Sequence, residues 1–162
     1  MVDGSFQPGN PVTRQQFAKM IVLTVGLPVT EADVSPFADI DTPTNDLYPD
    51  NYIAVAARSG LTVGTSDERF SPEASITRAQ VVSMAVRAAK ATHRELLATP
   101  PAGYSPAWVD FSTDHEENAR IAQYNGLLAG LPVADLDPWG NMTRGEVAQV
   151  LCNLSYLLGT GM

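Results

Sequence analysis

The amino-acid sequence predicts an all-α protein made of tandem helix-loop-helix repeats with long loops. The first observation is a six-residue phrase that occurs three times, at 12–17, 76–81 and 142–147. The second is its spacing, because the threonines of the phrase are 77 − 13 = 64 and 143 − 77 = 66 residues apart. A repeat of this length indicates one supersecondary unit copied along the chain. The third is that apolar residues recur at helical intervals, whereas no stretch alternates as a strand would.

Each copy of the phrase has the features of a helix start. Thr13, Thr77 and Thr143 can each accept the amide of the third helical residue, and the Gln or Glu at that third position can accept the threonine amide in return. This arrangement is a capping box. The apolar residues that flank each box can close a hydrophobic staple; the pairs are Val12 with Phe17, Ile76 with Val81, and Met142 with Val147.

The expected elements alternate capped helices with shorter ones, and glycines and prolines mark their ends. In chain order they are a capped helix from 14 to about 25, a loop over 28–49, a short helix over 52–59, a loop over 60–75, a capped helix over 78–91, a linker over 92–106, a helix through 121–122 to 126, a further loop and a capped helix to 158. The last helix has the most apolar stripe. We therefore expect it to be the most buried, with Cys152 in the core.

Composition limits the class of protein. With 162 residues, 44% of them hydrophobic, the chain can bury one core as a single domain. A net charge of −8 and only 10 Lys and Arg argue against a nucleic-acid partner. No segment approaches the ~20 apolar residues of a membrane helix, and no signal peptide is recognisable. Because Met1 falls in the middle of a repeat, we expect any export signal to lie upstream.

An arginine follows each capping threonine, at Arg14, Arg78 and Arg144. A cation in the first turn of a helix opposes the helix dipole and costs roughly 0.3–1 kcal/mol. One use of such a position is an anion site, where helix amides and a guanidinium point at the same ligand. The alternative is structural, in which each arginine bridges to an acidic loop residue such as Asp39 or Asp110.

A longer pattern surrounds the second copy. It comprises Phe37-Ala-Asp39-Ile40, Tyr48, Gly60-Leu-Thr-Val-Gly64, Phe70-Ser-Pro72 and Ile76-Thr77-Arg78-Ala79-Gln80. This pattern resembles the S-layer homology (SLH) repeat. The third copy is looser, with Trp108-Val-Asp110-Phe111 at the F-x-D position and Gly145 in place of the usual alanine.

The resemblance divides the chain, a single SLH-type domain over 1–162, into two and a half to three tandem repeats. The first repeat, over 1–29, has only its C-terminal half; the second spans 34–91, the third spans 107–160, and 92–106 is a linker. The resemblance further implies a pseudo-threefold arrangement with grooves between neighbouring repeats. Because half of the first repeat is missing, we expect one groove to be open, or covered by upstream sequence or a second molecule, so self-association through this repeat is an open alternative.

The resemblance also implies a function: a non-catalytic module that anchors proteins at the bacterial cell surface. Its partner would be an acidic, often pyruvylated, secondary cell-wall polysaccharide attached to peptidoglycan, held in the inter-repeat grooves. Carried over by position, the binding residues would be Arg14, Arg78 and Arg144, with Asp39 and Asp110. Loop aromatics can stack on sugar rings; the candidates are Tyr48, Trp108 and Trp139, of which Trp139 is favoured because Pro138-Trp139-Gly140 directly precedes a cap.

Other classes of function find little support. The acids are dispersed without a glycosidase phrase, and no nucleophile motif is present. His93 and His115 lie 22 positions apart and lack the spacing of metal ligands, so neither a metal nor a cofactor is expected. The main alternative is a protein-interaction or self-assembly module of the S-layer that binds no glycan.

Overall fold

The computed structural model describes residues 4–40 and 46–160. Residues 1–3 of the predicted first repeat, 41–45 of the second, and 161–162 lie outside the described residues. The α-helices of the described part are α1 (Arg14–Thr24), α2 (Asp50–Arg58), α3 (Arg78–His93), α4 (Thr113–Tyr124) and α5 (Arg144–Leu157). Two short 3₁₀ helices, η1 (Arg94–Leu96) and η2 (Val133–Asp135), lie in the connections. The prediction of an all-α fold is confirmed.

All three predicted capping boxes are formed. The Thr13, Thr77 and Thr143 hydroxyls accept the amide three residues on, and the side chains of Gln16, Gln80 and Glu146 accept the threonine amides. The helix starts are therefore where the repeated phrase places them. α3 runs two residues beyond its expected end at 91, and η1 occupies the first part of the expected linker.

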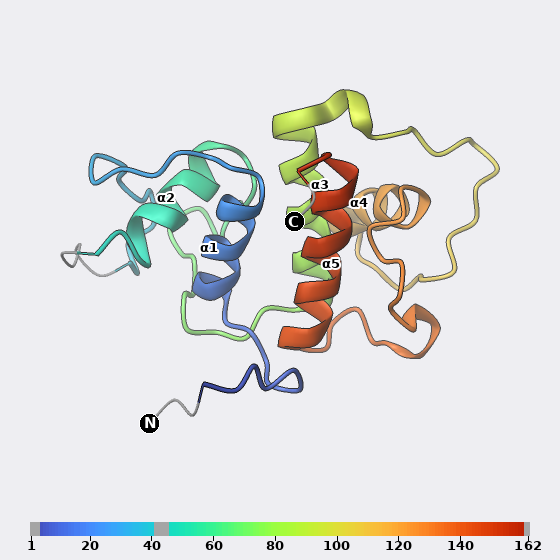
Figure 1. Ribbon diagram of the computed structural model, residues 1–162, viewed down its shortest axis with the longest axis horizontal. Coiled ribbons are helices and arrows are strands. Elements are labelled where there is room, and N and C mark those ends of the chain that lie inside the picture. The colour runs from blue at the N-terminus through green and yellow to red at the C-terminus, as the bar shows by residue number, and fades with distance from the viewer. Residues whose placement is uncertain (1–3, 41–45, 161–162) are drawn as a thin grey trace.

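The three capped helices α1, α3 and α5 stand side by side at the centre, and the loops before them are joined by a ring of backbone hydrogen bonds (Figure 1). The amide of Val12 donates to the carbonyl of Met142 (3.1 Å), that of Met142 to Ile76 (2.9 Å), and that of Ile76 to Val12 (2.9 Å). All three side chains are completely buried. The ring returns to its starting residue after three steps, which is a pseudo-threefold arrangement.

A second cyclic set of hydrogen bonds, which runs in the opposite sense, joins the helix N-termini to the loops. The first amides of an α-helix have no partner within the helix. Here the amide of Arg14 donates to Ala74 (2.9 Å), that of Arg78 to Gly140 (3.1 Å), and that of Arg144 to Asn10 (2.8 Å). Each capped helix thus has its first turn completed by the loop that precedes the next capped helix.

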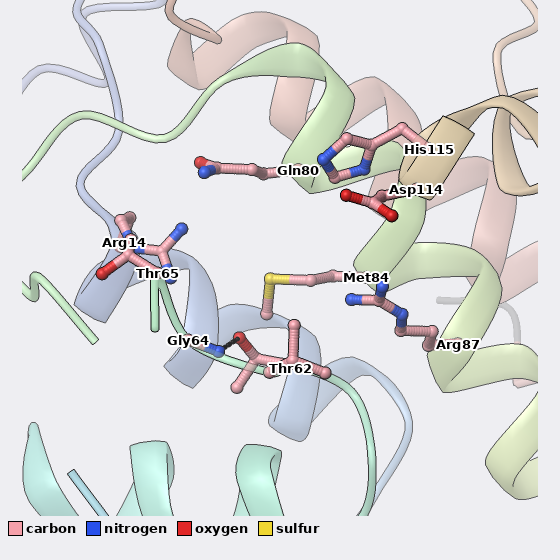
Figure 2. A pocket seen from close by; sticks show the side chains of 10 residues that line it. Arg14, Thr62, Gly64, Thr65, Gln80, Met84, Arg87, Asp114 and His115 are labelled. Atoms are coloured by element: carbon pink, nitrogen blue, oxygen red, sulfur yellow. Dashed lines mark hydrogen bonds between the residues drawn. The ribbon is translucent and has the colours of Figure 1, made fainter. Parts of the chain in front are cut away.

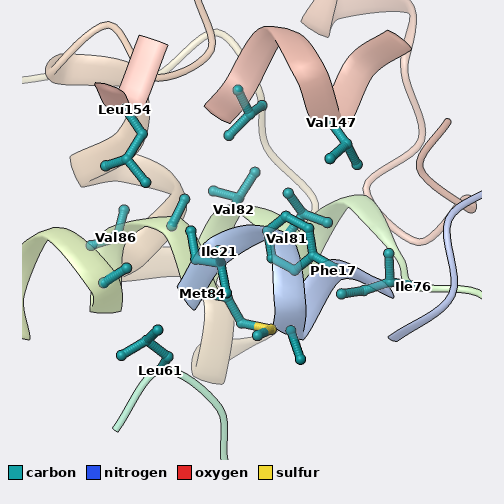
Figure 3. Close-up of a cluster of buried hydrophobic side chains, with 14 of the residues drawn as sticks. Phe17, Ile21, Leu61, Ile76, Val81, Val82, Met84, Val86, Val147 and Leu154 are labelled. Atoms are coloured by element: carbon teal, nitrogen blue, oxygen red, sulfur yellow. The ribbon is translucent and has the colours of Figure 1, made fainter. Parts of the chain in front are cut away.

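One hydrophobic core lies among these helices (Figure 3). α3 passes through its centre, and 9 of its 16 residues are buried, against 4 of 14 in α5. The expectation that the last helix is the most buried was therefore wrong. Cys152 is exposed rather than part of the core, as is Tyr156 at 71%, because α5 has a wider apolar surface than its two neighbours cover.

The shorter helices cover the bundle from outside. α2 packs on α1, and α4 packs on α3 (Figure 1). In the described part of the chain, α5 contacts α1 and α3 but has no short helix in the corresponding position. Among the described residues, the outer side of α5 therefore lacks the short helix that covers α1 and α3. No helix among the described residues combines the length and hydrophobicity needed to cross a membrane.

Candidate functional site

A cleft of about 580 Å³ lies between the first two capped helices (Figure 2). Four segments form it: the first residue of α1, a glycine-containing loop, one face of α3 and the start of α4. The lining residues are Arg14, Thr62, Val63, Gly64, Thr65, Gln80, Met84, Arg87, Asp114 and His115.

Local sequence explains how these walls approach each other. Gly64 has φ +77°, and a Cβ there would lie 2.6 Å from both the Arg69 carbonyl oxygen and the Phe37 ring, so only glycine fits the turn. On α3, Gln80, Met84 and Arg87 are spaced i, i+4 and i+7, which places them on one face of the helix.

Arg14 is held at the base of the cleft. The residue is only 3% exposed, its Nε donates to the carbonyl of Phe70 (2.6 Å), and its guanidinium carbon lies 4.7 Å from the centre of the Phe70 ring. Burial lowers the pKa of Arg14, and the charge of Asp39 opposes that shift. An arginine so confined stays protonated at neutral pH, so this wall carries a fixed positive charge.

The opposite wall carries a second guanidinium, that of Arg87, together with Asp114 and His115 (Figure 2). Burial lowers the pKa of Arg87, and Asp114 opposes the shift. Nδ1 of His115 lies 2.6 Å from the Ser83 hydroxyl. Burial and the charge of Arg87 lower the pKa of His115, while Asp114 raises it. The cleft therefore combines two cations, one carboxylate and an imidazole that favours its neutral form.

Arg78, by contrast, is neutralised. Its Nε and Nη2 donate to the two carboxylate oxygens of Glu146 (2.9 and 3.2 Å), and its Nη1 donates to the carbonyl of Asp137 (3.1 Å). Both side chains of the ion pair are 14% exposed. Arg78 therefore has the structural role considered above, an ion pair with an acidic residue, but its partner is Glu146 of α5 and not a loop aspartate.

Arg144 repeats the geometry of Arg14 at the third position. Its Nε donates to the carbonyl of Phe6 (2.7 Å), and its guanidinium carbon lies 5.2 Å from the centre of the Phe6 ring. The residue borders a separate cleft of about 240 Å³ whose walls are mainly apolar, formed by Phe6, Met20, Thr24, Val147, Ala148, Leu151 and Cys152. This cleft lies on the side of α5 that has no short helix.

The two predicted aspartates have backbone roles. The carboxylate of Asp39 accepts the amides of Phe70 and Ser71 (both 2.8 Å). Desolvation raises the pKa of Asp39, but these bonds and Arg69 outweigh that effect and hold it below its usual value. The carbonyl of Asp110, which has φ +70°, accepts Nε1–H of Trp139 (3.1 Å). Among the described residues, neither aspartate forms an ion pair with an arginine that follows a cap.

The three candidate aromatic residues have different environments. Trp108 is 4% exposed and its Nε1–H donates to the carbonyl of Leu136 (2.8 Å), so its ring anchors a loop and presents no free face. Tyr48 lies with its ring centre 5.2 Å from Nζ of Lys19. Trp139 is 46% exposed and packs edge-to-face on His115, with ring centres 5.7 Å apart. Through His115, Trp139 is in contact with the lining of the cleft.

Of the residues that line the cleft, the sequence predicts a binding role for Arg14 but not for the residues of α3 and α4 on the opposite wall. The signal for Gln80, Met84 and Arg87 is their spacing, which places them on one face of the helix that begins at the second copy of the repeated phrase. His115 had no comparable signal, because the packing of α4 on α3 brings it to the cleft. In the described part of the chain, no group of three or more His, Cys, Asp or Glu side chains is arranged to hold a metal ion.

Comparison with known proteins gives matches along most of the chain. The family model described as the S-layer homology domain matches residues 1–18 and 43–82. An endoglucanase of Bacillus sp. (strain KSM-635) is 31% identical over 153 residues, which are 94% of this chain and 16% of that protein. An S-layer protein of Bacillus thuringiensis subsp. finitimus is 26% identical over 97% of this chain and 18% of its own length.

A third relative is an uncharacterized cell wall amidase of Bacillus anthracis, 28% identical over 92% of this chain and 26% of its own length. The chain thus spans about a quarter or less of each of these relatives, whose names describe different activities. What they share with it is the segment that contains the three capped helices. The family match, the S-layer relatives and the three capping boxes agree, and the chain belongs to the S-layer homology domain family.

Proposed function

We propose that this chain is a non-catalytic anchoring module that binds an acidic secondary cell-wall polysaccharide in the cleft between α1 and α3. Membership of the S-layer homology family supports a cell-surface anchoring module in general. The observation that carries the finer proposal is a cleft with two guanidinium groups, from Arg14 and Arg87, in a protein whose net charge is −8.

The chemistry of the cleft suits an acidic sugar. A guanidinium offers a planar fork of donors that matches a carboxylate, and such bonds are stronger when water is partly excluded. Arg14 and Arg87 stand on different walls, so a sugar between them can present a carboxylate to one and its hydroxyls to the other. A pyruvylated sugar, which carries its carboxylate on a ketal, is one form of this ligand. Trp139, next to His115, supplies an exposed aromatic face beside the cleft.

Binding to isolated cell-wall sacculi tests the proposal. Sacculi of a bacterium with an S-layer are compared before and after hydrofluoric acid treatment, which strips polysaccharides joined through phosphodiesters. The wild-type protein is expected to sediment with untreated sacculi and to remain in solution with stripped ones. Equal binding to both would contradict a polysaccharide ligand.

A charge-matched pair of variants then tests the cleft. Arg87→Gln removes one lining cation and is expected to weaken binding at least tenfold, about 1.4 kcal/mol. Arg94→Gln removes the same charge from an exposed residue just beyond the end of the same helix, outside the cleft, and is expected to bind like the wild type. Circular dichroism verifies that both variants are folded. Equal binding by the two variants would contradict a ligand in this cleft.

The alternative function is protein interaction or S-layer self-assembly. The observation that favours it is the apolar cleft beside α5, together with the 71% exposed ring of Tyr156 on the same helix. Under this alternative the protein self-associates as its concentration rises, and Leu151→Glu, which places a charge in that apolar cleft, abolishes the association without changing the binding to sacculi. Sedimentation velocity over a range of concentrations separates the two.

A further inference from the structure

In α3 and α5 the third helical residue lies on the side of the arginine that begins the preceding capped helix, and this residue differs between the two helices. Glu146 of α5 faces Arg78 of α3, whereas Gln80 of α3 lines the same cleft as Arg14 of α1. The difference of one atom, carboxylate oxygen against amide nitrogen, changes what each arginine can bind.

Glu146 satisfies two partners at once. Its Oε2 accepts the amide of Thr143 (2.8 Å) and so closes the capping box, while the carboxylate also accepts Nε and Nη2 of Arg78. A carboxylate has about four acceptor positions, so both tasks are compatible. The result is an arginine whose fork is already occupied.

Gln80 can perform only the first of these tasks. Its Oε1 accepts the amide of Thr77 (3.1 Å), and its other terminal group is an NH₂ donor, so Gln80 has neither the charge nor the second acceptor oxygen with which a carboxylate pairs both nitrogens of a guanidinium. Among the described residues, the one hydrogen bond from the Arg14 side chain is that from Nε to Phe70, and Arg14 has no ion pair. The residue is 97% buried, since 3% is exposed, and its two Nη groups remain available to the cleft (Figure 2).

A second difference closes the neighbouring groove. Asn153 stands 66 residues after Arg87, at the equivalent position of α5. Its amide nitrogen donates to the carbonyls of Leu127 and Ala129 (3.0 and 2.9 Å), which ties the loop around Gly130 to the helix. The cleft at Arg14 therefore has a second cation, Arg87, whereas the groove at Arg78 has at this position the amide of Asn153, which is bonded to the loop beside it.

We infer that Gln80 is a specificity-determining residue: it leaves the fork of Arg14 uncommitted, so the cleft between α1 and α3 takes a sugar with a carboxylate, whereas Glu146 occupies Arg78 and removes it from ligand binding. The inference rests on the proposed glycan-binding function and refines it to one carboxylate-binding cap arginine in a complete cleft. The ligand class is a uronic acid or pyruvate-ketal sugar.

Gln80→Glu tests the inference. The variant keeps the capping box, because Glu fills the same role in α5, and it gives Arg14 a carboxylate partner. The probes are methyl β-D-glucuronide and the neutral methyl β-D-glucoside, titrated into ¹⁵N-labelled protein. The wild type is expected to bind the glucuronide at one site and more tightly than the glucoside; Gln80→Glu is expected to lower glucuronide affinity at least tenfold and to leave the glucoside unchanged.

The matched control is Gln16→Glu, the same change at the equivalent position of α1, which does not line this cleft and is expected to bind as the wild type. The inference is overturned if Gln80→Glu binds the glucuronide as the wild type does, or if the wild type binds both probes equally. If either of these results is obtained but the wild-type protein still binds sacculi, the proposed function stands and only the role of Gln80 is rejected. Glu146→Gln is expected to retain one site, because Asn153 still closes the second groove, and a second glucuronide site would contradict this.

Discussion

At the scale of single residues, three arginines in equivalent positions have three different environments. Arg14 is buried beside an open cleft, Arg78 is paired with Glu146, and Arg144 borders an apolar cleft. The backbone around them is nearly the same, so the differences arise from the residues they face. Sequence repetition therefore predicts where these arginines lie and leaves open what each of them does.

His115 gives the cleft a pH dependence that can be measured through stability. Burial and Arg87 lower the pKa of His115 in the folded protein, so the folded state binds this proton less readily than the unfolded state does. The stabilisation from the neutral ring is complete above the unfolded pKa of about 6.5 and is lost as the pH falls through the lowered value. We expect the free energy of unfolding to fall more steeply between pH 7.5 and 5.5 in the wild type than in His115→Gln.

Urea denaturation at a series of pH values measures this difference. His93→Gln, which changes the other histidine at a partly exposed site outside the cleft, is the control and is expected to keep the steep dependence. If the free energy of unfolding has the same pH dependence in the wild type and in His115→Gln, folding does not lower the pKa of His115.

At the scale of elements, the capping boxes do more than begin helices. Each box places a threonine at the end of a loop that also supplies carbonyls to the preceding capped helix, so one short segment completes two helix starts. The phrase is repeated because both tasks recur at every corner of the ring. Local helix rules explain the threonine and the third residue, while the tertiary arrangement explains the residues before them.

Thr77→Ala tests the cap of the central helix. Loss of the hydroxyl leaves the Gln80 amide without its partner, and we expect a loss of about 1 kcal/mol of unfolding free energy, within a range of roughly 0.5–2. The control is Thr92→Ala in the last turn of the same helix, where the hydroxyl donates to the carbonyl of Ala88 and alanine is the better helix former. That variant is expected to be neutral or slightly stabilised in urea denaturation; equal losses would indicate that the cap itself contributes little.

The helices and their caps could be predicted from the sequence because capping chemistry and apolar spacing act over a few residues. Two expectations about α5 failed for the opposite reason. Its stripe showed that one face is apolar, but whether another element covers that face depends on tertiary contacts, and Cys152 and Tyr156 are left exposed. Likewise, Arg14 could be proposed from its place after a cap, whereas His115 reaches the cleft through helix packing alone.

At the scale of the whole molecule, the ring through Val12, Ile76 and Met142 makes the repeats interdependent. No capped helix has its first turn completed by its own repeat. The hydrophobic core also joins the repeats, because α3 packs against both α1 and α5. Folding is therefore expected to be cooperative over the described part of the chain, and the linker after η1 does not divide it into separate units.

Ile76→Ala tests this cooperativity. The side chain is completely buried at the ring, so its truncation is expected to cost about 2–5 kcal/mol, and Ile76→Val about 0.5–1.5. Val34→Ala, at an 84% exposed position, is the control and is expected to change little. Circular dichroism reports all helices, whereas tryptophan fluorescence reports Trp108 and Trp139 in the third repeat; coincident transitions are expected. A fluorescence transition separate from the loss of helix would show that the repeats unfold independently.

The closed ring also determines how this domain bears tension. A force that pulls on α5 acts on backbone bonds from Met142 to Ile76 and from Gly145 to Pro8, so the load passes to both other repeats together. In an open row of the same helices, junctions would separate one after another under a pulling force. In a closed ring of three, each capped helix is joined to both others, so a force can detach one of them only by breaking two junctions together.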